Sequence, residues 1–207
     1  LYDVHKETIN PKHPFAKFSV GNTETLSDKA NRCIRDEVAQ FFNQHYVAKA
    51  MTLVLEGPLS LAELQQLAEK YFSAISDNAP SNLLPDAPLY QPEHQQICLA
   101  VKPVKNDHQL IVSFALPGID EYYREKPESL LSYLLGHEGP NSILSVLKQK
   151  QWALGLTAGA GVNGYNFKDF NVSIRLTEAG EHFVDDIISL IFSYIELLKL
   201  HPLPEHF

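Results

Sequence analysis

The sequence predicts an α+β fold in which a largely antiparallel sheet packs under helices. Within residues 108–116, large apolar side chains recur at every second position, as in a strand with one apolar face: Leu110, Val112, Phe114 and Leu116. Residues 152–162 and 165–176 flank Asn163-Gly164, a dipeptide that favours a tight hairpin, so these segments are expected to be antiparallel neighbours. Apolar residues at helical spacing lie outside these strands, which indicates helices segregated from the sheet.

The first part of the chain predicts a helix, a strand and a second helix. Apolar side chains recur every three or four positions over residues 31–46, as in an amphipathic helix. Residues 51–56 form a short apolar run of strand type that ends at a Gly-Pro pair. Ser60 and Glu63 have the spacing of a capping box, which predicts that a helix begins there.

A linker is expected between two domains. Residues 77–96 contain four prolines among serine, asparagine and aspartate, a composition typical of loops. The sequence therefore predicts the end of one domain in residues 1–82, a linker in residues 83–96 and the start of a second domain in residues 97–207.

The second part predicts two strands, two helices, a hairpin and a last helix. Residues 97–101 form an apolar strand-like run ahead of the alternating strand. Pro127 suits the first turn of a helix that stops at Gly136, and Pro140 begins the next helix. Thr177 is expected to cap the last helix.

Composition excludes several classes of function. The 207 residues are 44% hydrophobic, yet no apolar run approaches the ~18 residues of a membrane span. A net charge of -8 gives no electrostatic help in binding nucleic acid. Cys33 and Cys98 lie far apart without Cys-x-x-Cys spacing, so we expect thiols and not metal ligands or a redox pair.

Two blocks resemble one enzyme family. Residues 136–142, Gly-His-Glu-Gly-Pro-Asn-Ser, and residues 10–18, Asn-Pro-Lys-His-Pro-Phe-Ala-Lys-Phe, are similar to segments of the insulinase/pitrilysin family of zinc metalloendopeptidases, in the same order. The resemblance implies that the chain is an internal piece of a longer protein that degrades peptides in a closed chamber. Its partners would be peptide substrates and the remainder of the parent chain.

The resemblance places zinc in the full-length parent and none in this chain. The family binds zinc through a helical His-x-x-Glu-His motif, which puts two histidines one turn apart, and the motif does not occur here. The nearest approach, His201 to His206, is one residue too long and contains two prolines that prevent a helix. His137 and Glu138 are adjacent and point about 100° apart, so they cannot bind one metal together. No catalytic residue is expected in this chain.

The resemblance also implies a peptide-anchoring exosite. Gly136 and Glu138 match its loop, and the strand that follows matches through Leu156 and Gly159. Glycine weakens a strand unless another backbone must approach closely, which fits strand addition by a peptide. A glycine-rich hairpin arm with a bulge explains the same pattern without a ligand. The expected substrate-binding residues are Gly136, Glu138, Leu156, Thr157, Ala158, Gly159, Ala160 and Tyr2, the last matching an aromatic residue near the scissile-bond pocket.

Other interpretations stay open at this stage. The parent could be a non-catalytic relative that serves as a structural or assembly subunit, and a His-x-x-Glu-His motif upstream would decide against it. A free-standing peptide-binding module is disfavoured because the chain begins inside a predicted helix. The compartment is undecided: the resemblance favours a bacterial periplasm, with the cytoplasm as the alternative.

Overall fold

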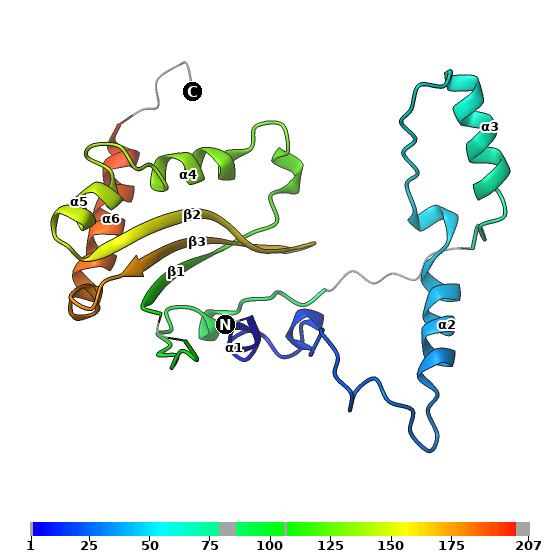
Figure 1. Cartoon of the computed structure of the whole chain (residues 1–207), viewed down its shortest axis with the longest axis horizontal. Coiled ribbons are helices and arrows are strands. Elements are labelled where there is room, and N and C mark those ends of the chain that lie inside the picture. The colour runs from blue at the N-terminus through cyan, green and yellow to red at the C-terminus, as the bar shows by residue number, and fades with distance from the viewer. Residues whose placement is uncertain (1, 79–85, 106, 202–207) are drawn as a thin grey trace. The chain divides into compact units, whose positions relative to one another are not determined.

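The chain forms two compact units in a computed structural model that describes residues 2–78, 86–105 and 107–201. One unit combines residues 1–17 with residues 85–207, and the other contains residues 18–84. Figure 1 labels the helices and strands of both units. The linker at residues 83–96 and the domain limits on either side of it stay predictions.

A three-stranded antiparallel sheet forms the centre of the larger unit. Its strands are β1 (Gln109–Leu116), β2 (Ala153–Gly164) and β3 (Phe167–Leu176), in the spatial order β1-β3-β2. β1 pairs with β3 without interruption, from Gln109 opposite Arg175 to Leu116 opposite Lys168. The predicted α+β class is confirmed, and so is the antiparallel pairing of β2 with β3.

Helices cover one face of this sheet. They are α4 (Pro127–Leu135), α5 (Ile143–Gln149) and α6 (Val184–Leu200) (Figure 1). Alternate residues of β3 point into the helical layer, since successive strand side chains face opposite ways. The buried members of this core are Leu135, Ile143, Leu144, Leu147, Ala153, Leu156, Phe170, Val172, Ile174, Leu176, Ile187 and Ile191. In the described ranges, no helix combines the length and hydropathy needed to cross a bilayer.

Residues 2–17 pack against the start of β3 in the larger unit. α1 (Tyr2–Lys6) begins the chain, and Ile9 joins Leu89 and Phe167 in a second, smaller core. The Asn10 side chain donates a hydrogen bond to the Pro88 carbonyl at 2.8 Å, and its main-chain N–H donates to the Leu89 carbonyl at 3.0 Å. Residues distant in sequence are thereby fixed to the start of β3.

The smaller unit contains two amphipathic helices, as predicted. They are α2 (Ile34–His45) and α3 (Leu61–Phe72). The capping box is confirmed: the Glu63 N–H donates to Ser60 Oγ at 3.4 Å, and Glu63 Oε2 accepts from the Ser60 N–H at 2.9 Å. Val47 is the only buried hydrophobic residue among residues 18–78.

Two predicted strands are wrong. Residues 51–56 and 97–101 form no strand, and all of them are exposed. An apolar run supplies side chains for a strand, but the strand itself requires a neighbour for its backbone N–H and C=O groups. Within the described part of the chain, neither segment has such a neighbour.

The hairpin turn lies two residues later than predicted. Gly164 pairs with Phe167, so Tyr165 and Asn166 form the turn. A bulge causes the shift, because Ala160 to Asn163 spans three steps on β2 against two steps on β3. Gly164 has a packing role instead: a Cβ there would lie 2.2 Å from Cε1 of Phe167.

Two helix starts also differ from the prediction. α5 begins after Ser142, whose Oγ accepts from the Ser145 N–H at 3.1 Å, and not at Pro140. Thr177 Oγ1 accepts from the Gly180 N–H at 3.0 Å in the turn before a short 3-10 helix (Gly180–Phe183), whose N-cap is Ala179, and α6 begins only at Val184. α4 has the predicted limits, from Pro127 to a C-cap at Gly136.

Candidate functional site

The outer edge of β2, residues 155–161, lies beside the last turn of α4. β2 is the terminal strand in the order β1-β3-β2, so no described strand pairs with its outer side. A Cβ on Gly136 would lie 2.6 Å from the Ser132 carbonyl oxygen and 3.6 Å from the Ala158 nitrogen. A Cβ on Gly159 would lie 3.4 Å from Ser132 Oγ. The structure therefore places Gly136 beside Ala158, and Gly159 beside Ser132, and we call residues 155–161 the β2 edge.

The residues of the β2 edge differ in how far their side chains are exposed. Thr157 and Ala160 are exposed, whereas Leu156 is 5% exposed and belongs to the core. Only the main chain of Leu156 is therefore available to a ligand. Gly155 has no atom within 4 Å of an added Cβ, whereas a Cβ on Gly161 would lie 2.1 Å from Asn171 Nδ2. A side chain at position 161 would therefore crowd Asn171, whereas position 155 has room for one.

An exposed carboxylate lies in the loop that follows α4. Glu138 is exposed and makes no hydrogen bond or ion pair in the part of the chain that the structure describes. Its neighbour His137 turns elsewhere, because a Cβ on Gly139 would lie 2.5 Å from His137 Nε2, and the His137 ring centroid lies 5.8 Å from that of Tyr133. His137 and Glu138 therefore do not act as a pair.

The remaining predicted site residue is Tyr2, at the start of α1. Its side chain lies outside the described part of the structure, so its role near a scissile bond stays a prediction.

Sequence reasoning missed a buried polar cluster on β3. Asp169 is 2% exposed and accepts a 2.7 Å hydrogen bond from the Tyr90 hydroxyl. His5 Nε2 lies 2.7 Å from the Tyr90 hydroxyl and 3.7 Å from Asp169 Oδ2. Burial raises the pKa of Asp169, while the Tyr90 hydrogen bond and the His5 charge oppose that rise. Burial and the nearby Asp169 carboxylate raise the pKa of Tyr90.

This cluster has a structural role, because it holds three segments of the larger unit together. α1, the segment around Tyr90, and β3 each contribute one side chain. An aspartate between the aromatic residues Phe167 and Phe170 of a strand was the available sequence signal, since a buried carboxylate needs partners. The partners themselves come from 79 and more residues away, so spacing could not identify them.

The described residues do not fit a zinc site. No three His, Cys, Asp or Glu side chains come together there as metal ligands would. Cys33 and Cys98 are both exposed and free. The histidine at the end of the tail, His206, lies outside the described residues.

Comparisons with known proteins match this chain to one family. The family model described as the peptidase M16 inactive domain matches residues 32–206. The A-factor-processing enzyme of Saccharomyces cerevisiae is 39% identical over 202 residues, covering 96% of this chain and 20% of that protein. The insulin-degrading enzyme of Homo sapiens is 37% identical over 203 residues, again covering 96% of this chain and 20% of the relative.

A solved structure matches as well. A crystal structure of pitrilysin superposes with a TM-score of 0.84 at 28% identity, covering 99% of this chain and 22% of that one. The chain thus spans about a fifth of the length of the proteins it matches. It belongs to the insulinase/pitrilysin family of peptidases, within the region described as the inactive domain.

Proposed function

We propose that this chain supplies the substrate-anchoring surface of a zinc metalloendopeptidase that degrades peptides in a closed chamber. The observation that carries the proposal is the β2 edge, an outer strand of small residues beside Gly136 and close in sequence to the exposed Glu138. The names of the relatives, A-factor-processing enzyme and insulin-degrading enzyme, describe action on polypeptides and support a peptide as the ligand.

Main-chain pairing would hold the peptide. A terminal strand presents N–H and C=O groups that a neighbouring extended backbone can pair with. Each such hydrogen bond contributes about 0.5–1.5 kcal/mol net, so a few of them give weak and sequence-tolerant binding. Small residues at positions 158 to 161 allow the two backbones to approach closely.

Glu138 would select the amino terminus of the peptide. The carboxylate has no cationic partner within the described ranges, so a free α-amino group can take that place. Charged groups that are exposed to solvent attract one another weakly, which makes this contact a selector and not the main source of affinity.

The proposal is tested with prolines in the full-length protein that carries this chain, kept in chelator so that peptides stay intact. Successive N–H groups of a strand point to opposite edges, so Ala158→Pro and Gly159→Pro remove one inward and one outward donor. The variant that removes the outward donor, recognised by its unchanged free energy of unfolding, is expected to weaken binding of a fluorescent extended peptide roughly two- to tenfold, as one lost hydrogen bond implies.

Leu61→Pro is the matched control. Leu61 occupies the first position of α3, where proline is tolerated, and its side chain is exposed. Peptide binding should be unchanged in this variant. If neither β2 proline weakens binding while the fold is retained, the β2 edge is not the anchor. A full-length protein that binds peptide but contains no zinc by elemental analysis before any chelator is added would retain the anchoring role and lose the hydrolytic one.

Glu138→Gln tests the selector separately. Peptides with a free amino terminus should bind about two- to fivefold less tightly to the variant, because only they present a cation. Acetylated peptides should bind equally to both proteins. An equal loss for the two kinds of peptide would remove Glu138 from the site.

A further inference from the structure

We propose that Arg175 forms a subsite on the open face of the sheet that selects an acidic side chain of the docked peptide. The inference rests on the proposed function, because it requires a peptide on the β2 edge. It adds a substrate class, peptides with aspartate or glutamate at one defined position.

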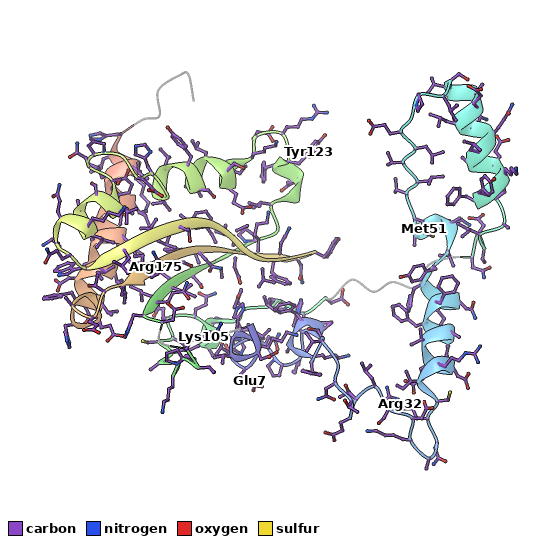
Figure 2. The ribbon with its side chains drawn as sticks, in the orientation of Figure 1. Glu7, Arg32, Met51, Lys105, Tyr123 and Arg175 are labelled. Carbon is purple, nitrogen blue, oxygen red and sulfur yellow. The ribbon has the colours of Figure 1, made fainter. Side chains whose placement is uncertain are left out.

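Arg175 lies on the face of β3 opposite α4, α5 and α6, at the far end of the strand from the Asp169 cluster. Its neighbours Ile174 and Leu176 are buried in the helical core, and strand side chains alternate, so Arg175 points to the opposite face. The Arg175 side chain is exposed (Figure 2). Along this face of β3, the next residues are Ser173 and Asn171, which are neutral.

The residues beside Arg175 leave a path to the outer strand. Arg175 pairs with Gln109 on β1 and with Gly155 on β2. Gly155 has no side chain, and nothing lies within 4 Å of where a Cβ would be. A guanidinium on β3 can therefore extend over Gly155 without meeting any described residue other than the chain neighbours of that glycine.

A docked peptide would place one side chain within its reach. Neighbouring strands are ~4.8 Å apart, so a peptide paired to β2 would lie about 9.6 Å from β3. Long side chains meet across diagonal positions about 7–8 Å apart on adjacent strands, and arginine and glutamate, extended toward each other, share the somewhat longer distance here. An extended arginine and a glutamate of the peptide can therefore meet above Gly155.

The charge of Arg175 is not neutralised within the described residues. No ion pair or hydrogen bond involves its guanidinium there, and its register partners Gln109 and Gly155 are neutral. The whole chain carries a net charge of -8, which repels acidic peptides in general. The Arg175 cation would attract an acidic side chain at the one peptide position nearest to it, although the chain as a whole repels acidic peptides. Guanidinium also suits carboxylates because it can donate two parallel hydrogen bonds.

The test measures binding of a peptide series to the full-length protein in chelator. The parent peptide is uncharged apart from a free amino terminus, and a single glutamate is moved along it, with glutamine at the same position as the reference. We expect one position at which glutamate binds about two- to fivefold more tightly than glutamine, the range of an exposed ion pair. The preference should diminish as salt is raised.

Three variants test whether Arg175 causes the glutamate preference. Arg175→Gln should abolish the glutamate preference, and Arg175→Lys should retain it, since the charge is kept. Arg35→Gln is the matched control: it removes an exposed arginine from α2 and should leave the preference unchanged. A preference that persists in Arg175→Gln overturns the proposal, and so does its absence at every position.

The outcomes separate this inference from the proposed function. If the β2 prolines weaken binding but no glutamate preference depends on Arg175, the peptide docks at the β2 edge and the subsite is wrong. If the prolines have no effect, both proposals fail together.

Discussion

The two units of the chain carry similar amphipathic patterns and bury them to very different extents. In the larger unit, the apolar stripe of α6 is completed by the sheet, and Ile187 and Ile191 are fully buried. In the smaller unit, α2 has an equally regular stripe, yet Val38, Phe41 and Phe42 are all more than half exposed. A periodic pattern therefore specifies which face of a helix is apolar, and burial depends on whether another element covers that face.

The difference has an energetic consequence. Burying a large apolar side chain contributes about 1.5–3 kcal/mol, and an exposed one contributes almost none of this. The core of the larger unit combines three strands and three helices, whereas the described part of the smaller unit has Val47 as its one buried hydrophobic residue. The larger unit should hold nearly all of the cooperative stability, and the following experiments test that contrast.

The largest effect is expected at the centre of β3. Ile174→Ala leaves a cavity in the core, because Ile174 is 0% exposed, and should lower the free energy of unfolding by about 2–5 kcal/mol. Val38→Ala removes an apolar group that is already 61% exposed and should change it by less than about 0.5 kcal/mol. Urea denaturation of both variants measures the difference, and equal losses would contradict the contrast between the units.

A second comparison uses two glycines. A Cβ on Gly180 would lie 2.0 Å from the Trp152 carbonyl oxygen, which also accepts a 3.0 Å hydrogen bond from the Thr177 N–H. Gly180→Ala must therefore move backbone and should cost about 1–3 kcal/mol. Gly57→Ala in the smaller unit meets nothing within 4 Å, so the melting temperature should stay the same or rise. A lowered melting temperature for Gly57→Ala would show that its surroundings are more crowded than described.

An effect of intermediate size concerns pH. Burial raises the pKa of Asp169, so the folded chain holds the proton more tightly than the unfolded chain does. The contribution of Asp169 to the free energy of unfolding is fully present at pH values below the usual carboxyl pKa of about 4. It is lost as the pH rises through the raised pKa of Asp169 in the folded chain. Asp169→Asn should remove this decline in a series of denaturation curves. Persistence of the full decline in the variant would assign it to other groups.

Glu37 in the smaller unit should give the opposite pH dependence of stability, a loss as the pH falls. Its hydrogen bond from Arg32, at 2.7 Å, lowers the pKa of the carboxyl. Any contribution from this exposed pair is present above the usual carboxyl pKa and is lost as pH falls through the lowered pKa. Glu37→Gln should remove that small acid-side loss and leave the Asp169 decline unchanged.

The smallest effect is expected from two helix caps of the same chemistry. Ser142→Ala removes the buried cap of α5 and should lower global stability by about 1 kcal/mol. Ser60→Ala removes the exposed cap of α3 and should only increase fraying there, which hydrogen exchange of the α3 amides would detect. A global loss from Ser60→Ala would mean that α3 is coupled to the core.

Short-range sequence signals determined several helices and one strand of this protein. The apolar periodicity over residues 31–46, the capping box at Ser60 and Glu63, and Pro127 before Gly136 each predicted an element that forms, because these signals act within one or two turns. The alternation in residues 108–116 likewise predicted β1. The residues that carry the family resemblance, 10–18 and 136–142, are also contiguous in the sequence and so could be read directly.

Tertiary structure decided everything that depends on a partner far away in the chain. Residues 51–56 and 97–101 have the composition of strands but no described neighbour for their backbone groups, so they form none. The bulge before Asn163 moved the hairpin turn, and the partners of Asp169 come from segments near the beginning and middle of the chain. The position of Arg175 across from Gly155 is likewise a matter of register. Sequence alone specifies which residues alternate on a strand, whereas register is fixed only when the strands pack together.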